Sequence, residues 1–278
     1  MTLIKRQLKD IELNPPRVLA LGFAGLIFLG AFLLNLPIAT ASGESIGFLD
    51  ALFTSASSVC VTGLVVVNTG MFWSHFGQVV IICLIQMGGL GFMTMATFVA
   101  LILGKKITLK ERLIIKEQLN QETMSGLVKL TKYIILSTFT IEGIGAILLS
   151  TRFIPKYGFG KGVWFSIFHS ISAFCNAGFD ITGNSIVPFV GDTVVNLTIC
   201  LLIIIGGLGF SVYIDISKNK KFKRFSLHTK LVLLITLILI VVGTILIYLI
   251  EWNNPGTLYN LKPKEKISAS FFQAVVPR

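Results

Sequence analysis

The sequence predicts an all-α integral membrane protein built from repeated units, and three observations support this fold class. Of the 278 residues, 54% are hydrophobic and 13% are charged, so too few side chains are polar enough to cover a soluble domain of this length. Five apolar stretches are long enough to cross a bilayer as helices. The letters GGLGF occur at residues 88–92 and again at 206–210, which indicates an internal repeat.

The five apolar stretches are the expected membrane spans. A helix needs about 20 residues to cross the hydrocarbon core. The first stretch has no evident cleavage site, so we interpret it as a retained span, with a cleaved signal peptide as the alternative. The spans are residues 18–39, 79–103, 133–150, 193–214 and 231–250.

The positive charge predicts the orientation of these spans. The net charge is +11, and 17 of the 24 Lys and Arg residues lie in segments 1–17, 104–132 and 218–230. All three segments face the cytoplasm if the amino terminus is cytoplasmic and each span crosses once, which is the positive-inside pattern. We therefore expect a multi-pass protein of the cell membrane that does not bind nucleic acid. The basic cytoplasmic loops could also bind anionic lipid.

Between the long spans lie two shorter apolar segments. Residues 48–67 and 163–182 align without a gap at an offset of 115 residues, whereas the two GGLGF copies are 118 residues apart. Each segment has an apolar run of about 12 residues, which is too short to cross the bilayer. We expect each segment to be a re-entrant half-helix that enters and leaves on one face. The repeat unit is then span, half-helix, glycine-containing turn and span.

The repeats divide the chain into three parts. Residues 1–104 form pore repeat 1, residues 105–217 form pore repeat 2, and residues 218–278 form an incomplete pore repeat 3. Each full unit contains two spans, so the copies are parallel and surround a central pore along the membrane normal. Since residue 278 falls before the third turn, we expect the chain to be a fragment, or a truncated product, of a longer protein with a complete third unit and a fourth.

The two glycine-containing turns are the candidate ion-binding sites. Glycine allows backbone angles that aim carbonyl oxygens toward the pore axis. Each half-helix also points its partially negative carboxyl end at the same place. Carbonyl rings favour a dehydrated cation, and neither turn carries a basic side chain for an anion. The candidate filter residues are Val61, Thr62, Gly63, Leu64, Asn176, Ala177, Gly178 and Phe179.

The turns CVTGL and CNAGF, each followed by a span with GGLGF, resemble those of the Trk/Ktr/HKT potassium transporter family. The resemblance covers the whole chain. The first span begins by residue 18, which is more similar to the Ktr-type membrane subunit than to the Trk type. The resemblance implies potassium uptake through four pseudo-repeats, each with one filter glycine, here Gly63 and Gly178. The chain departs from the family pattern by ending before the third filter turn.

The resemblance also implies partners and ions. It implies a homodimer of the full-length protein and a cytosolic, nucleotide-binding regulatory ring. Potassium is the expected substrate, bound by the backbone carbonyls of the filter, and sodium is a candidate coupling ion. No covalent cofactor is expected.

Two other functions remain open on sequence grounds. A non-conducting membrane scaffold or assembly subunit could use the same repeat, although it would not need a glycine in both turns. A transporter of another small solute is the second alternative, such as sodium, ammonium or water. An enzyme is not expected, because the sequence has no glycine-rich phosphate loop, no nucleophile elbow, no CxxC motif and no paired carboxylates.

Several residues outside the turns are candidates for the pore mouth or the gate. Glu142 is an acid inside a span, where it either marks a functional site or makes a structural hydrogen bond. Asp180 follows the second turn, where it either attracts cations or is a solvated loop residue. Gly70, in the outer loop, is expected to tolerate a side chain. The glycines of the repeated motif either permit close helix packing or form a hinge; they are Gly88, Gly89, Gly206 and Gly207.

Overall fold

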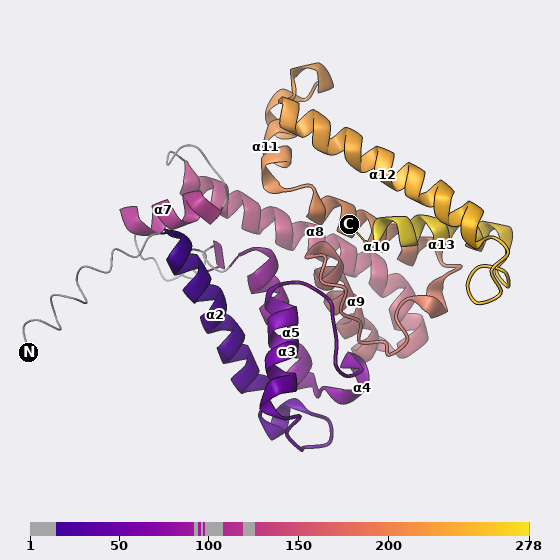
Figure 1. Ribbon diagram of the computed structural model, residues 1–278, viewed down its shortest axis with the longest axis horizontal. Helices are drawn as coiled ribbons and strands as arrows, with labels where there is room; N and C mark the ends of the chain where they lie inside the picture. Colours follow the sequence, from indigo (N-terminus) through magenta and orange to yellow (C-terminus); the bar gives the residue numbers. More distant parts are fainter. Residues whose placement is uncertain (1–14, 92–93, 96, 98–107, 119–125, 278) are drawn as a thin grey trace, which may run out of the picture.

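A computed structural model describes residues 15–91, 94–95, 97, 108–118 and 126–277, and these residues are helical or irregular, with no strand (Figure 1). The helices, in chain order, are α2 (Pro15–Leu34), α3 (Phe48–Val59), α4 (Thr69–Phe72), α5 (His75–Gly89), α7 (Leu109–Gln118), α8 (Leu127–Tyr157), α9 (Phe159–Phe174), α10 (Thr193–Gly207), α11 (Phe210–Asn219), α12 (Leu227–Glu251) and α13 (Pro263–Val275). Helices α2, α3 and α5 pack together, α8 packs on α9, and α12 packs on α13. The basic residues Lys5, Arg6 and Lys9 of segment 1–17 lie outside the described residues.

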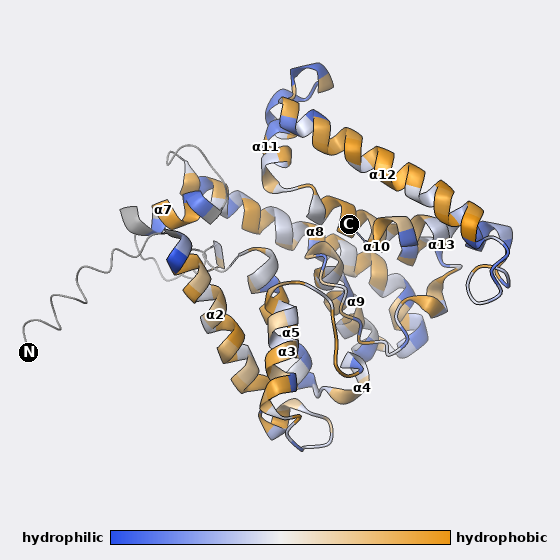
Figure 2. Ribbon diagram, in the orientation of Figure 1, coloured by the Kyte–Doolittle hydropathy of each residue, from blue (hydrophilic) through white to orange (hydrophobic). Residues whose placement is uncertain are grey.

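Among the described residues, three helices are each long and apolar enough to cross a membrane. They are α2, α8 and α12, with mean hydropathies of 2.2, 1.7 and 3.1 over their most apolar windows. Helix α12 is apolar along its length (Figure 2), although only 6% of its most apolar window is buried within the protein. An exposed apolar helix of this length needs lipid around it. The described helices therefore confirm the predicted fold class, an all-α membrane protein.

Two of the expected spans are not single straight helices. The expected span 193–214 divides into α10 and α11, which meet at an angle of 91°. Gly209 at the break has a φ of +82°, which glycine adopts without steric cost. In the expected span 79–103, α5 ends at Gly89 and Gly91 has a φ of +78°. Residues 98–103 of that span lie outside the described residues, as do Lys105 and Lys106 of the next basic segment.

Polar side chains set the start of several helices. Ser74 accepts a hydrogen bond from a backbone N–H in the first turn of α5, and Ser226 does the same for α12. Asp192 accepts two such bonds at the start of α10. Each cap satisfies N–H groups that the first turn leaves unpaired. Helix α3 begins at Phe48, so Asp50 lies inside its first turn and is not its cap.

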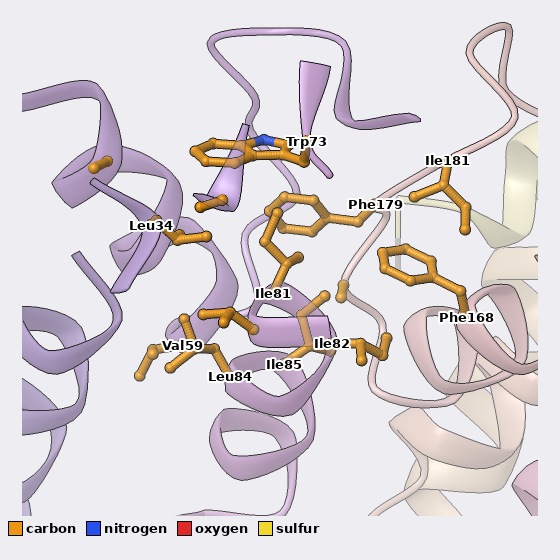
Figure 3. Packing of buried hydrophobic residues seen from close by; sticks show 14 residues of the cluster. Leu34, Val59, Trp73, Ile81, Ile82, Leu84, Ile85, Phe168, Phe179 and Ile181 are labelled. Carbon is orange, nitrogen blue, oxygen red and sulfur yellow. The ribbon is translucent and has the colours of Figure 1, made fainter. Parts of the chain in front are cut away.

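A hydrophobic cluster joins the first repeat to the second turn. Val59 at the end of α3 packs with Ile81 and Ile85 of α5, and all three are at most 1% exposed. Phe179 of the second turn inserts into the same cluster near Trp73 (Figure 3). The first and second turns are therefore fixed relative to each other by burial of a shared core.

Candidate ion-binding site

The first turn leaves α3 in a conformation fixed by Ser57. Val61 and Gly63 have φ values of +57° and +76°. The backbone N–H of Thr62 donates to the carbonyl of Ser57 at 2.9 Å, and the Ser57 hydroxyl donates to the carbonyl of Leu64 at 2.7 Å. One serine thus holds both ends of the turn. Sequence analysis could not give the direction of this side chain.

The second turn has the same geometry 115 residues later. Asn176 and Gly178 have φ values of +59° and +71°. The N–H of Ala177 donates to the carbonyl of Ser172 at 2.7 Å, and the Ser172 hydroxyl donates to the carbonyl of Phe179 at 2.9 Å. Ser172 was missed as a site residue, although its alignment with Ser57 in the repeat was a usable signal.

The two turns contact each other at their glycines. A Cβ atom added to Gly63 would lie 2.5 Å from the carbonyl oxygen of Ala177 and 3.5 Å from the Cα of Gly178. A Cβ atom added to Gly178 would lie 3.8 Å from the Cα of Gly63. The turns therefore bring together the two filter glycines that the sequence predicts. A side chain at Gly63 has no room beside the neighbouring backbone.

The glycines of the GGLGF motif pack against the ends of the half-helices. A Cβ atom at Gly88 would overlap the carbonyl oxygen of Val59, and one at Gly206 would overlap that of Phe174. A Cβ atom at Gly89 would lie 2.7 Å from the sulfur of Cys175. Close packing therefore accounts for these three glycines. Gly207 is the last residue of α10, directly before the bend described above.

A second matched contact lies deeper in the two repeats. The Ser55 hydroxyl on α3 donates to a carbonyl of α2 at 2.7 Å, and the Ser170 hydroxyl on α9 donates to a carbonyl of α8 at 2.6 Å. Gly30 faces Ser55, and Gly145 faces Ser170. Each half-helix is thus fastened to the span before it in the same way.

Glu142 lies at the junction between the two repeats. It is 4% exposed, and its Oε2 accepts a hydrogen bond from Gln86 Nε2 at 3.2 Å. Its Oε1 has no partner among the described residues. The sulfur of Cys175, directly after α9, lies 3.8 Å from Gln86 Oε1. The partner Gln86 was missed, although an amide inside an apolar span is a signal for a buried hydrogen bond.

Asp180 organises the loop that follows the second turn. Its carboxylate accepts hydrogen bonds from the backbone N–H groups of Thr182, Gly183 and Ser185 at 2.9 to 3.0 Å. His169 Nε2 lies 2.9 Å from its Oδ1. Burial opposes ionisation of Asp180, but the hydrogen bonds from His169 and Thr182 outweigh burial and hold the pKa of the carboxyl below its usual value. Asp180 is therefore a hydrogen-bonded anchor and not a freely solvated loop residue.

The outer loops of the two repeats are also joined. The side chain of Asn68 donates to the carbonyl of Gly183 at 2.8 Å. A Cβ atom at Gly70 would overlap the carbonyl oxygen of Ile181. The expectation that Gly70 tolerates a side chain is therefore wrong, because its neighbour is backbone that cannot rotate away.

A pocket with about 610 Å³ of open space borders the second turn and α13, with His169, Asp180 and Phe272 among its lining residues. No group of three or more His, Cys, Asp or Glu side chains that could hold a metal ion occurs among the described residues.

The whole-chain comparison gives the family of the protein. Residues 27–278 match the model of the TrkH family, described as cation transport protein. The chain belongs to this family. It is 50% identical over its whole length to the Ktr system potassium uptake protein B of Bacillus subtilis and covers 62% of that protein. It is 44% identical over its whole length to the potassium/sodium uptake protein NtpJ of Enterococcus hirae and covers 61% of it.

A third relative is the Ktr system potassium uptake protein B of Vibrio alginolyticus, which is 40% identical to this chain. The alignment covers 95% of this chain and 58% of the Vibrio protein. The chain thus spans about three fifths of the length of these relatives. The resemblance to the Trk/Ktr/HKT transporters is confirmed, and the family is one of cation transporters, not of enzymes.

Proposed function

We propose that the chain forms part of a pore for potassium uptake across the cell membrane. The observation that carries the proposal is the pair of opposed glycine turns, which share their backbone angles and their serine hydrogen bonds at the ends of α3 and α9. Both half-helices direct their carboxyl ends toward these turns, which favours a cation there.

In this proposal the ion is bound by backbone carbonyls and not by side chains. The candidate filter is the set Val61 to Leu64 together with Asn176 to Phe179, within re-entrant segments of repeats 1–104 and 105–217. The matched contacts of the two half-helices support repeats 1–104 and 105–217 as equivalent units. We assign residues 218–278 to an incomplete third repeat on the sequence pattern. Non-helical backbone at membrane depth is stable where protein or a water-filled path surrounds it.

The names of the relatives support the proposed substrate, and the family resemblance implies the partners. Two of them are named for potassium uptake, which favours potassium as the substrate. The name of the Enterococcus relative includes sodium, so sodium transport or sodium coupling is the second candidate. We further propose a cytoplasmic amino terminus, a homodimer of the full-length protein, a cytosolic nucleotide-binding ring, and anionic lipid at segments 104–132 and 218–230.

Growth rescue of cells that lack potassium uptake would test this function. We would place the chain in a chimera that replaces the aligned segment of the Bacillus relative, because that protein supplies the remaining part of its own length. The chimera should restore growth at low external potassium and take up rubidium. A matched chimera with Gly63→Ser should fail at low potassium while it reaches the membrane in equal amount.

Three outcomes separate the candidates. Uptake of sodium without rubidium would favour the sodium transporter. Absence of uptake of either ion by a chimera that is folded and inserted would favour the non-conducting scaffold. Rubidium uptake that is unchanged by Gly63→Ser would contradict the assignment of the turns as the filter.

A further inference from the structure

His169 lies on α9, close to the second turn, and its ring meets an acceptor at each nitrogen. Nδ1 is 2.7 Å from the carbonyl oxygen of Phe165, and Nε2 is 2.9 Å from Asp180 Oδ1. A carbonyl oxygen only accepts hydrogen bonds, and an ionised carboxylate also only accepts. Both ring nitrogens must therefore donate, and an imidazole that donates from both nitrogens is a protonated imidazolium.

The alternative, a protonated Asp180 that donates to a neutral ring, conflicts with the other partners of this carboxylate. Asp180 Oδ1 accepts from the N–H and hydroxyl of Thr182, and Oδ2 accepts from the N–H groups of Gly183 and Ser185. These donors stabilise the ionised carboxylate because they donate hydrogen bonds to it. A neutral His169 would leave a ring lone pair facing an oxygen of Phe165 or of Asp180.

The surroundings shield the His169 ring from water more than the Asp180 side chain, which is 22% exposed. The His169 ring is 5% exposed, and the rings of Phe153, Phe165 and Phe168 meet it at edge-to-face angles. Among the described residues of the pocket, Asp180 is its charged neighbour, and α10 and α13 contribute apolar side chains there. The charged or titratable side chains near the carboxyl end of α8 and the start of α10 are Arg152, Lys156, Tyr157 and Asp192, of which Arg152 pairs with Asp192 at 3.4 Å.

The pair is connected to the filter through the loop after Gly178. Asp180 lies two residues after this glycine, and its carboxylate accepts hydrogen bonds from the N–H groups of residues 182, 183 and 185. Gly183 in turn accepts a hydrogen bond from Asn68 of the first repeat. Movement of Asp180 would therefore alter the second turn and its link to the outer loop of the first.

We propose that His169 is a positioning residue of the second filter turn, whose imidazolium fixes Asp180, so that loss of this ring loosens the turn and lowers potassium selectivity. The proposal rests on the proposed function of the turn as a filter.

The first turn has no equivalent pair. The matched positions are Thr54 and Val65, which lie 115 residues earlier. The Thr54 hydroxyl donates to the carbonyl of Asp50 at 2.9 Å, as His169 Nδ1 does to Phe165. Val65 has no polar atom in its side chain, so no ion pair can form. The charge pair is thus specific to the second of these two turns.

Nitrogen NMR on the 278-residue chain in lipid nanodiscs tests the protonation directly, and it does not depend on transport. The chain has three histidines, and His75 and His228 are exposed. At one fixed pH near neutrality, the His169 ring should carry protons on both nitrogens, because each nitrogen faces an acceptor. The signal is assigned by its loss in His169→Gln. A His169 ring that carries a proton on only one nitrogen overturns the proposal.

Hydrogen exchange of the same chain tests the positioning role. At one fixed pH, the amides of residues 182, 183 and 185 should exchange at least about tenfold faster in His169→Gln than in the native chain, since a charged hydrogen-bond partner of Asp180 is lost. His75→Gln is the matched control and should keep the native rates. Equal rates in His169→Gln and His75→Gln overturn the positioning role.

Rubidium uptake by the chimera against competing sodium tests the consequence. At one fixed pH, His169→Gln should lose about tenfold in potassium preference relative to the native sequence, and His75→Gln should keep the native preference. A native preference in His169→Gln contradicts the inference. If the chimera takes up no rubidium while the NMR and exchange results hold, the proposed function fails and the positioning of the loop by His169 stands.

Discussion

Gly63 and Gly178 occupy equivalent positions in the two turns but differ in their surroundings. Both have positive φ values, which any residue with a Cβ atom adopts at a cost. A side chain at Gly63 would also collide with the carbonyl oxygen of Ala177, whereas one at Gly178 would meet only the Cα of Gly63 at 3.8 Å. The sequence predicts both glycines as a pair, but the difference between them depends on how the turns contact each other.

We therefore expect Gly63→Ala to be more harmful than Gly178→Ala. The strain from the positive φ alone is about 1–2 kcal/mol at each position, and Gly63 adds the collision with backbone. In the chimera, the potassium concentration for half-maximal uptake should rise in both variants, and further in Gly63→Ala. Gly25→Ala in α2, where no atom lies within 4 Å of the added Cβ, is the control. Wild-type uptake in both turn variants would argue against the filter.

The Glu142–Gln86 hydrogen bond leads to a second prediction at this scale. Glu142→Leu removes the acceptor and leaves the Gln86 amide unpaired in a buried place, which costs about 1–3 kcal/mol. Gln86→Leu should have a similar cost because it leaves the carboxyl unpaired. The double variant should be less destabilised than the sum of the two, as thermal unfolding of the chain in detergent would measure. Strict additivity would show that the two side chains do not stabilise each other.

At the scale of elements, hydropathy predicted the three long helices because burial in lipid requires a continuous apolar run. It could not predict the break between α10 and α11, because the letters on both sides of Gly209 remain apolar. The repeated GGLGF did predict close packing, since small residues let helices approach. Which backbone atom each glycine contacts depends on the register of α5 and α10 against the half-helices, and one sequence does not contain that register.

Gly206→Ala tests this packing. The added methyl group would overlap the Phe174 carbonyl, so α10 must move away from α9 or the turn must shift, at a cost of about 1–3 kcal/mol. The chain should unfold at a lower temperature in detergent. Gly143→Ala in α8 is the matched control, because its Cβ meets no atom within 4 Å and alanine favours a helix by about 1 kcal/mol. If both variants unfold together at the native temperature, the close contact at Gly206 is not a source of stability.

At the scale of the whole molecule, the two repeats are joined by contacts that connect residues far apart in the sequence. Phe179 enters the core of the first repeat, Asn68 binds the carbonyl of Gly183, and Gln86 binds Glu142. The two glycine turns could be predicted from the sequence, since each lies in a local pattern that repeats, whereas their role as a filter and the number of repeats stay predictions. The two hydrogen bonds join residues that are 115 and 56 positions apart in the sequence. No local pattern could therefore predict these three cross-repeat contacts.

The orientation in the membrane is the last prediction, and it concerns the molecule as a whole. Segment 218–230 holds six Lys and Arg residues at the start of α12, and moving several cations across a bilayer during insertion is unfavourable. This segment should therefore be cytoplasmic, and the segment 252–262 at the other end of α12 should be external. A membrane-impermeant thiol reagent added to intact cells should label Asn260→Cys and spare Lys220→Cys, both at exposed positions. The chain that has only its four native cysteines gives the background labelling. In permeabilised cells, the added cysteines at both positions should react. Labelling of Lys220→Cys in intact cells, with Asn260→Cys protected, would invert the topology and would place the two filter turns at the cytoplasmic face.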